Sequence, residues 1–326
     1  MSAARTLPAG IAIHVVINAG SGADDKDSVR PVLERAFAAR GNPVRFHLIE
    51  DSSGIEETVA AARQACLDAP GVLVAAGGDG TVNAAAAAIA DSEIPFAVVP
   101  MGTFNYFARD LGMPLDPEAA AAAILDGEIS PCHLARVNDR PFLVNASIGL
   151  YVKLMEVRER HESRLGRNRV VAVVSGLVTA LGGFYGMTLD LAVEGKMQTL
   201  RAPLVFLGKN YLQLRNLDFD IAEGVARGQI GVIVLRDARP RAILGMAWMA
   251  LLGRLQDALP LRAFCVDRLE IRTRRRSVAA VVDGEIMRLT SPLTVEVRRN
   301  ALQVVHPQAA SRDAEANSLA AAGGER

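Results

Sequence analysis

Between residues 11 and 130, short runs of β-branched residues alternate with alanine-rich segments, and this alternation limits the fold more than any other feature. Apolar runs typical of strands cover residues 11–17, 44–49, 71–75 and 96–99. Segments with helical periodicity cover residues 29–40, 55–68, 83–90 and 117–125. Asp116 suits the N-cap of the last segment, and Pro117 suits its first helical position. Strands and helices taken in turn predict a doubly wound parallel sheet, with ligand-binding loops at the carboxyl ends of its strands.

The sequence pattern changes after Pro131, where successive apolar runs each indicate a strand. We expect strands over residues 134–137, 141–147, 187–193, 200–208, 231–235, 269–274, 277–282 and 293–298. Helical insertions are expected at about residues 153–184 and 242–257. This pattern predicts a mainly antiparallel β domain. The expected organisation is an α/β domain over residues 1–130, a β domain over residues 131–307 and a disordered tail at 308–326.

The charge and cysteine content narrow the range of functions. Lys and Arg together number 36, as do Asp and Glu, so no global basic field gathers nucleic acid and any anion site must be local. Cys66, Cys132 and Cys265 lie far apart without metal-ligand spacing, which indicates buried thiols in a reducing compartment. The longest uncharged stretch, residues 170–189, contains several glycines and indicates a buried or surface-docking segment rather than a membrane span.

A glycine-rich loop follows the expected strand at residues 71–75. Its sequence over residues 77–83 is Gly-Gly-Asp-Gly-Thr-Val-Asn. Glycines allow phosphate oxygens to approach backbone N–H groups, and the helix that follows adds the positive end of its dipole. Asp79 in this loop could hold Mg²⁺ or orient a phosphoryl acceptor. The alternative is a tight βα turn with a capping aspartate.

Two further loops end expected strands in the same way. One follows residues 96–99 and supplies Gly102, Thr103 and Asn105; the other follows residues 11–17 and begins at Asn18. Loops at the carboxyl ends of parallel strands converge on one crevice. The three loops together predict a phosphate-binding site at this edge of the sheet.

These segments resemble the catalytic domain of the diacylglycerol kinase family, which includes bacterial lipid kinases and sphingosine and ceramide kinases. The first strand end is similar to the family's Asn-Pro-x-Ser-Gly, and residues 77–83 match its Gly-Gly-Asp-Gly-Thr-x-Asn. Residues 100–109 look like its Pro-x-Gly-Thr-x-Asn-x-x-Ala-Arg. Far downstream, residues 283–285 are Asp-Gly-Glu, again as in the family. Order, spacing and layout agree from about residue 11 to residue 307.

The resemblance implies an N-terminal nucleotide domain and a C-terminal β-sandwich that enclose ATP and Mg²⁺. It implies that Asp79 and Asp283 manage the metal together with the ATP phosphates, and that Glu285 accepts the proton of the lipid hydroxyl. A solvated β-turn is the alternative for residues 283–285. The residues implied to bind ATP are Asn18, Ser21, Gly22, Gly77, Gly78, Asp79, Gly80, Thr81, Asn83, Gly102, Thr103 and Asn105.

The chain departs from the family pattern at three places. Glu50 or Asp51 stands where relatives often have an ATP-contacting Thr, and Ala84 stands where they often have Glu. Arg227 precedes Gly228 where bacterial relatives hold a structural Mg²⁺ through an Asp-Gly pair. We therefore expect Arg227 to supply a positive charge there in place of that ion.

The leading interpretation is an ATP-dependent lipid kinase, a phosphotransferase that acts on the hydroxyl of diacylglycerol or a related lipid alcohol. The alternatives are an NAD kinase-like enzyme and a catalytically impaired lipid-binding regulatory protein of the same fold. We expect a lipid substrate at a membrane surface, no nucleic acid partner and a cytoplasmic location, and a homodimer is left open. Reversible membrane association would use residues 158–185 and the amphipathic stretch 242–255.

Overall fold

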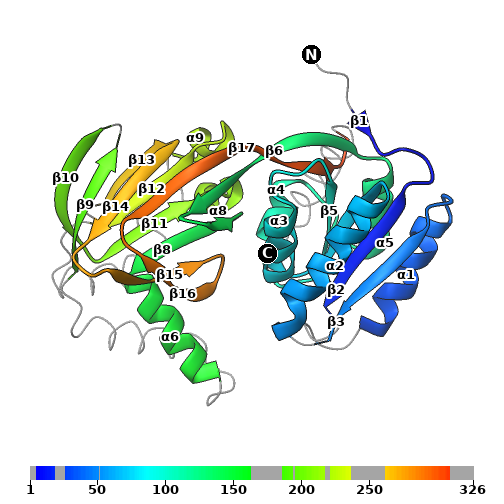
Figure 1. The fold of residues 1–326 in the computed structure, drawn as a ribbon, viewed down its shortest axis with the longest axis horizontal. Coiled ribbons are helices and arrows are strands. Elements are labelled where there is room, and N and C mark those ends of the chain that lie inside the picture. Colours follow the sequence, from blue (N-terminus) through cyan, green and yellow to red (C-terminus); the bar gives the residue numbers. More distant parts are fainter. Residues whose placement is uncertain are drawn as a thin grey trace, which may run out of the picture. The chain divides into compact units, whose positions relative to one another are not determined.

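The computed structural model describes residues 5–18, 26–50, 52–162, 186–193, 195–216, 221–235 and 261–308 (Figure 1). The chain forms two compact units: the first unit comprises residues 1–134 and 298–326, and the second unit comprises residues 135–297. The chain passes between the units within two strands, β6 (Glu128–Val137) and β17 (Leu293–His306).

The first unit contains a parallel sheet. Its strands are β2 (Ala12–Asn18), β3 (Val44–Ile49), β4 (Gly71–Gly77) and β5 (Pro95–Pro100), joined by the last part of β17. They lie in the order β17-β5-β4-β2-β3, and every neighbouring pair is parallel. A short strand, β1 (Arg5–Thr6), pairs antiparallel with β6. The predicted parallel sheet is confirmed.

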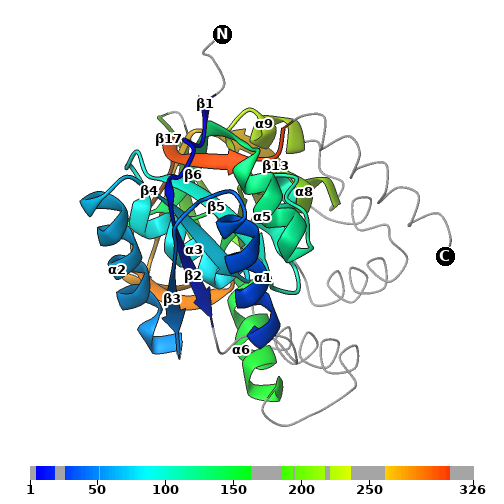
Figure 2. The same cartoon turned by 90° about the vertical axis from the view of Figure 1, so that its right-hand side faces the viewer.

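Helices cover both faces of this sheet. They are α1 (Lys26–Ala38), α2 (Ile55–Asp68), α3 (Asp79–Ile89), α4 (Tyr106–Asp110) and α5 (Pro117–Leu125), with a 3₁₀ turn, η1 (Ser52–Gly54), before α2. Helix α1 contacts α5, and α2 contacts α3. Figure 2 shows α2 on one side of β2 and β3, with α1 and α5 on the other. The Asp116 carboxylate accepts a hydrogen bond from the N–H of Ala119 at 2.8 Å, which confirms the predicted cap.

The strand order contains a reversal next to β2. From β2 the chain moves outward to β3, and then it returns to β4 on the opposite side of β2. In open α/β sheets, ligands bind outside the carboxyl ends of the strands at such a switch point. Asn18 is the last residue of β2, and the β2–β4 register that pairs Ile17 with Ala76 brings it level with Gly77. The sheet topology thus favours a ligand-binding site at the edge where the glycine-rich loop begins.

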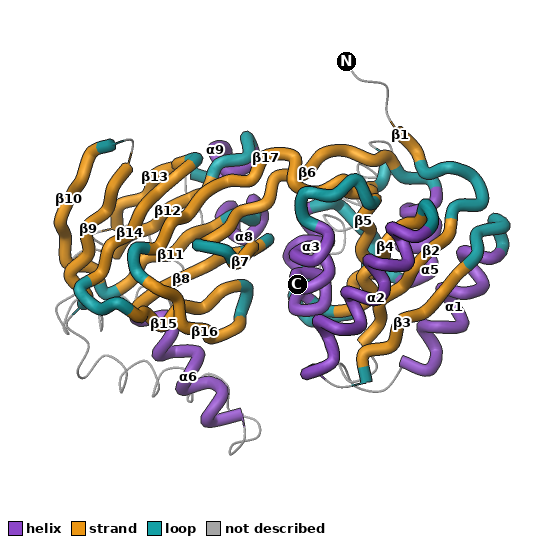
Figure 3. Tube along the Cα trace, viewed as in Figure 1, coloured by secondary structure: helices purple, strands orange, loops and turns teal. Residues whose placement is uncertain are grey.

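The second unit consists of antiparallel strands in two sheets (Figure 3). One contains β9 (Met187–Val193), β10 (Lys196–Ala202), β14 (Arg268–Thr273) and the first part of β17, and β7 (Arg140–Phe142) pairs with β6. The other sheet has the strand order β13-β12-β11-β8-β15-β16. Its strands are β13 (Leu261–Val266), β12 (Ile230–Leu235), β11 (Leu204–Gly208), β8 (Asn145–Gly149), β15 (Ser277–Val282) and β16 (Glu285–Thr290). Alternate residues of both sheets form one apolar core. The predicted antiparallel β region is confirmed.

Two expected strands are each divided. The run 141–147 is β7 followed by β8, and the run 200–208 is β10 followed by β11. Pro203 has no N–H to give to a ladder, and it separates residues that pair with β9 from residues that pair with β8 and β12. The chain therefore changes sheets at this proline.

In the described part of the second unit, three helices accompany the strands. Helix α6 (Leu150–Glu162) contacts β8, β15 and β16. Helices α8 (Tyr211–Asn216) and α9 (Ala222–Ala226) pack on Phe206 and Ile233, which lie on the face turned away from the main core. The remainder of the insertion expected at 153–184, all of the one expected at 242–257, and the tail beyond residue 308 lie outside the described residues.

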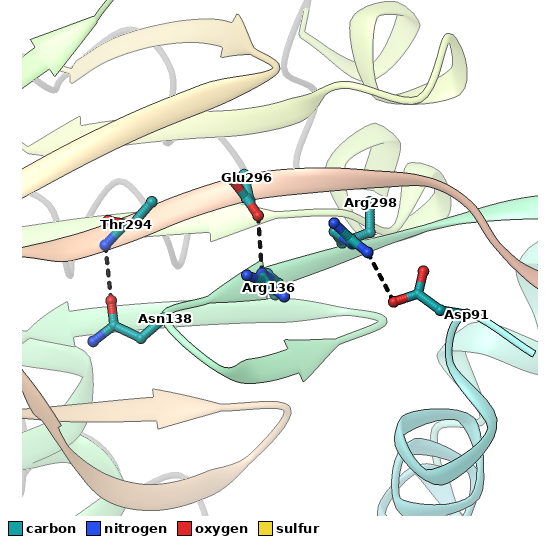
Figure 4. A network of polar contacts seen from close by, with 6 residues as sticks. All are labelled: Asp91, Arg136, Asn138, Thr294, Glu296 and Arg298. Atoms are coloured by element: carbon teal, nitrogen blue, oxygen red, sulfur yellow. Dashed lines mark hydrogen bonds and ion pairs between the residues drawn. The ribbon is translucent and has the colours of Figure 1, made fainter.

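Residues of β17 form hydrogen bonds and ion pairs with neighbouring segments in each unit (Figure 4). In the second unit, the Asn138 side chain accepts a hydrogen bond from the N–H of Thr294 at 2.8 Å, and Arg136 forms an ion pair with Glu296 at 2.9 Å. In the first unit, Arg298 donates to Asp91 at 2.9 Å. A single long strand thus has polar anchors in both units. No helix in the described part of the chain combines the length and apolar composition needed to cross a membrane.

Candidate functional site

The glycine-rich loop is the junction between a buried strand and a helix start. All seven residues of β4 are buried, and α3 begins at Asp79 with Gly78 as its N-cap. A Cβ atom on Gly77 would lie 2.7 Å from the Cβ of Thr81, which is itself 3% exposed. Only glycine lets the first turn of α3 fold back onto the end of β4. The N-terminal N–H groups of α3 therefore begin directly at the edge of the sheet.

The second predicted loop touches the first, backbone against backbone. The N–H of Met101 donates to the carbonyl of Gly77 at 2.9 Å. A Cβ atom on Gly102 would lie 2.6 Å from the Cα of Gly78. The structure thus brings together Gly77, Gly78 and Gly102, and the contact leaves no room for a side chain at Gly102.

Asn105 shapes the second loop. It adopts the left-handed conformation with φ 50° and is 7% exposed. Its side-chain oxygen accepts from the N–H of Gly102, and its side-chain nitrogen donates to the carbonyl of the same glycine, both at 2.8 Å. The amide of Asn105 is therefore engaged with its own loop, while Thr103 is exposed.

The carboxylate of Asp79 is bound to the start of a second helix. Burial raises the pKa of this carboxyl, and backbone hydrogen bonds from Tyr106, Phe107 and Asn105, together with the charge of Arg109, act in the opposite direction. These N–H groups belong to the first turn of α4 and its N-cap. Asp79 thus joins α3 to α4, and its predicted capping role is directed at a neighbouring helix.

Other predicted nucleotide ligands surround this junction. The side-chain oxygen of Asn83 is buried without a hydrogen-bond partner among the described residues. A Cβ atom on Gly80 would lie more than 4 Å from every described residue outside its own turn. Ser21 and Gly22 lie outside the described residues. A buried acceptor without a partner is uncommon in a folded protein, so Asn83 is a candidate ligand contact within α3.

An aromatic pair that the sequence analysis did not single out lies in the second loop. The rings of Phe104 and Tyr106 stack with centroids 5.5 Å apart and planes 7° apart, and Phe104 is 53% exposed. Phe104 is two residues from Gly102, whose backbone contacts the glycine-rich loop. The spacing of two aromatic residues around the loop asparagine was the available sequence signal.

In the second unit, Asp283 and Gly284 form the turn between β15 and β16, with φ values of 45° and 91°. The Asp283 carboxylate accepts hydrogen bonds from the N–H groups of three consecutive residues, Leu143, Val144 and Asn145, at 2.7, 2.9 and 2.8 Å. Its own N–H donates to the carbonyl of Asn145 at 2.8 Å. Asp283 therefore ties the hairpin to the connection between β7 and β8.

Glu285 is the first residue of β16 and is exposed. Its carboxylate differs from that of Asp283, which is half-buried and held by backbone amides. The structure places the predicted residues in different units: Asp79 and the two contacting loops belong to the first, and Asp283 and Glu285 belong to the second.

The positions that depart from the family pattern are ordinary in their surroundings. Glu50 is exposed after β3, and Ala84 lies within α3. Arg227 follows the end of α9 and forms an exposed ion pair with Glu223 at 3.7 Å. Its expected substitution for a metal stays a prediction.

Known proteins contain sequences similar to the segment that carries these loops. Residues 12–137 match the diacylglycerol kinase catalytic domain. A probable lipid kinase YegS-like of Serratia proteamaculans is 37% identical over 91 residues, which cover 27% of this chain and 30% of that protein. A diacylglycerol kinase of Staphylococcus epidermidis is 38% identical over 96 residues, 29% of each chain. The matched segments thus span less than a third of these relatives.

The solved structure of a diacylglycerol kinase from Bacillus anthracis has the same fold across both units. It aligns with a TM-score of 0.63 and 16% sequence identity, covering 92% of this chain and 98% of the other. The sequence match lies over the parallel sheet and its loops, where the glycine contacts were found. Residues 12–137 are thus similar to the diacylglycerol kinase catalytic domain.

Proposed function

We propose that the protein is an ATP- and Mg²⁺-dependent lipid kinase that transfers the γ-phosphoryl group to the hydroxyl of diacylglycerol or a related lipid alcohol. One observation carries this proposal: the two glycine loops touch backbone to backbone at the carboxyl ends of β4 and β5. Phosphoryl transfer needs positioning and charge neutralisation more than covalent chemistry, and closely packed backbone N–H groups at a helix start supply both.

The surroundings of the loops suit a nucleotide. Open space at Gly80 leaves room for phosphate oxygens, and the unpaired oxygen of Asn83 can accept from a ribose hydroxyl or a bound water. The exposed Phe104 ring offers a stacking surface for a base, since aromatic stacking tolerates any base with a π-face. Phosphate and base subsites would thus both come from segments that follow β4 and β5.

Mg²⁺ would be held mainly by the phosphates of the nucleotide. A carboxylate offers about four acceptor positions. Three amides already use positions on Asp79, and three use positions on Asp283. Each could add one contact to a metal, which fits the way Mg²⁺ binds through one or two carboxylates plus substrate phosphates. When bound, the ion would neutralise charge that develops on the phosphates.

Glu285 is the proposed proton acceptor, because it is the exposed carboxylate of the Asp-Gly-Glu segment. The hydroxyl oxygen of the lipid attacks the γ-phosphorus, and its proton moves to the carboxylate of Glu285. The bond between the γ-phosphorus and the bridging oxygen breaks, and ADP leaves with the electron pair. We also propose that the protein is cytoplasmic and meets its substrate by reversible docking at a membrane surface.

The direct test is a kinase assay with labelled ATP against diacylglycerol, a sphingoid base and NAD. Transfer to diacylglycerol or the sphingoid base supports the proposal, transfer to NAD alone indicates an NAD kinase, and transfer to none indicates a binding protein. Gly80→Ala sharpens the test, because the added methyl group lies more than 4 Å from the other described residues and would enter the proposed phosphate space. We expect unchanged folding and at least a roughly tenfold loss of ATP affinity, comparable to losing one charge-assisted contact. Unchanged affinity would place the phosphates elsewhere.

A further inference from the structure

Helix α8 of the second unit lies against two glycines of the sheet beneath it. Gly208 at the end of β11 pairs with Gly231 near the start of β12. Leu214 of α8 is fully buried. A Cβ atom on Gly208 would lie 2.9 Å from the Cδ2 of Leu214, and one on Gly231 would lie 3.0 Å from its Cδ1. Side chains at these two positions would force α8 away from the sheet, so the glycine pair fixes where the helix lies.

The next residue in this row is Asn145 of β8, which pairs with Gly208. Its side chain is 7% exposed, and its Nδ2 donates a hydrogen bond to the Oε1 of Gln213 in α8 at 3.2 Å. The N–H of Gln213 in turn donates to the Oδ1 of Asn210 at 2.8 Å. A buried amide donor that loses its acceptor is costly, so Gln213 fixes the side chain of Asn145.

The backbone on either side of Asn145 is held from two directions. The N–H groups of Lys209 and Asn210, just before α8, both donate to the carbonyl of Val144, at 2.8 and 3.2 Å. On the other side, the N–H groups of residues 143–145 donate to the carboxylate of Asp283. Three amides reach one carboxylate only in one arrangement of this segment. The start of α8 therefore controls how the segment presents its amides to Asp283.

We infer that Gln213 is a positioning residue for Glu285, and that it acts through Asn145 and Asp283. Glu285 directly follows the turn that Asp283 and Gly284 form, so its place depends on that turn. The role of Glu285 as proton acceptor rests on the proposed function, whereas the hydrogen bonds from Gln213 to the turn do not. A general base must lie within about 2.6–3.2 Å of its proton donor, and a displacement of about 1 Å can slow a reaction on the order of 100-fold.

Three variants isolate this effect. Gln213→Leu removes the acceptor of the Asn145 side chain at similar volume, and Gln213→Glu keeps an acceptor oxygen at the same reach. Gln198→Leu is the matched control, because the side-chain oxygen of Gln198 likewise accepts a side-chain hydrogen bond, from Arg262. Gln198 lies on β10, which pairs with β9 in the sheet that does not contain β8, β15 and β16.

The first measurement is hydrogen exchange of the backbone N–H groups of residues 143–145 and Asp283 in the full chain without ligands. We expect Gln213→Leu to accelerate this exchange by roughly threefold to tenfold, as the loss of one ordinary hydrogen bond implies. Gln213→Glu and Gln198→Leu should stay within about twofold of the wild type, since both keep an acceptor for Asn145. Unchanged exchange in Gln213→Leu would overturn the inference, and this result needs no substrate.

The second measurement is steady-state kinetics with ATP and whichever of diacylglycerol and sphingoid base is phosphorylated. Gln213→Leu should lower kcat by roughly tenfold, a partial displacement of the base, and leave the KM for ATP unchanged. Gln213→Glu should retain most of the activity, and Gln198→Leu all of it. An active wild type with normal kcat in Gln213→Leu would refute the positioning role and leave the proposed function standing. Equal losses in Gln213→Leu and Gln198→Leu would also refute it, because general destabilisation would then explain both.

A wild-type protein that phosphorylates neither lipid would refute the proposed function. The exchange rates alone would then decide whether Gln213 holds the turn at Asp283. Thermal melts of the three variants separate each of these outcomes from misfolding.

Discussion

Asp79 in the first unit and Asp283 in the second were both expected to manage a metal, and the two carboxylates have different surroundings. Each accepts hydrogen bonds from backbone N–H groups of another segment. Asp79 is desolvated beside a proposed anion site, and burial raises its pKa. Asp283 forms a hairpin turn in the left-handed conformation. The comparison indicates that Asp283 is chiefly a framework residue, while Asp79 combines a framework role with a charge next to the proposed phosphate site.

Glu285→Gln should have the largest effect on activity. The exposed carboxylate follows the turn that Asp283 holds, so the substitution removes basicity and keeps shape. We expect kcat to fall by a factor of about 10² to 10⁴, the usual contribution of a general base, with little change in ATP affinity.

Steady-state kinetics with saturating lipid measure this effect. Glu285→Asp is the matched control, because it keeps a basic group at a shorter reach and should retain part of the activity. A well-folded Glu285→Gln protein with more than roughly a tenth of the normal kcat would assign the proton to another group.

Asp283→Ala should have the largest effect on stability. It leaves the N–H groups of residues 143–145 without their acceptors and places alanine at φ 45°. We expect the free energy of unfolding to fall by about 2–4 kcal/mol. Asp283→Asn should cost less, because asparagine tolerates this conformation and keeps one acceptor oxygen.

Urea unfolding of both variants measures the difference. Equal destabilisation by alanine and asparagine would show that the negative charge, and not the hydrogen-bond geometry, stabilises the hairpin. A loss below about 0.5 kcal/mol for alanine, the range of ordinary surface changes, would contradict the framework role.

Gly102→Ala tests the loop contact in the first unit. The new methyl group would lie 2.6 Å from the Cα of Gly78 and 2.9 Å from the Asn105 side-chain oxygen, so the loops must separate. We expect a destabilisation of about 1–3 kcal/mol, as for overpacking elsewhere, together with weaker ATP binding. Gly80→Ala is the control for stability alone, because no described residue lies within 4 Å of its added methyl group. If the Gly102→Ala protein had normal stability, the two loops could separate without a loss of stability.

Local patterns in the sequence predicted much of the fold. The alternation of strands and helices, the Asp116 cap and the glycine-rich strand ends each depend on residues close together in the chain. Helices α8 and α9 have six and five residues, too few for a helical period to show. The return of β17 to the parallel sheet beside β5 also has no local signature, because pairing partners are distant in the sequence.

Of the candidate site, only the glycine-rich strand ends could be predicted from the sequence. A glycine-rich strand end can be recognised from a few residues, whereas the amides that hold Asp283 lie about 140 residues earlier in the chain. Long-range packing, rather than local propensity, decides which polar groups are left for chemistry.

The smallest predicted effect concerns a histidine pair on β2 and β3 of the first unit. The Nδ1 of His14 and the Nε2 of His47 are 3.2 Å apart, and His14 is 6% exposed. Burial lowers the pKa of His14 from its ordinary value of 6.5, and Arg45 adds to the effect. Burial also lowers the pKa of His47, with further contributions from His14 and Arg45.

Because the folded pKa values lie below 6.5, the unfolded chain binds more protons than the folded chain as the pH falls through this range. The stabilisation from the neutral pair is therefore complete above about pH 6.5 and is lost as the pH falls through the folded pKa values. Asp79, whose folded pKa is raised from 3.8, acts in the opposite direction. Thermal melts between neutral and mildly acidic pH should show a modest decrease in Tm that His47→Gln flattens, since glutamine does not titrate. His306→Gln is the control, because the Nδ1 of His306 lies 3.0 Å from the carbonyl oxygen of Pro307 and the ring lies outside the pair. If both variants keep the full pH dependence, the acid sensitivity of the first unit originates in other groups.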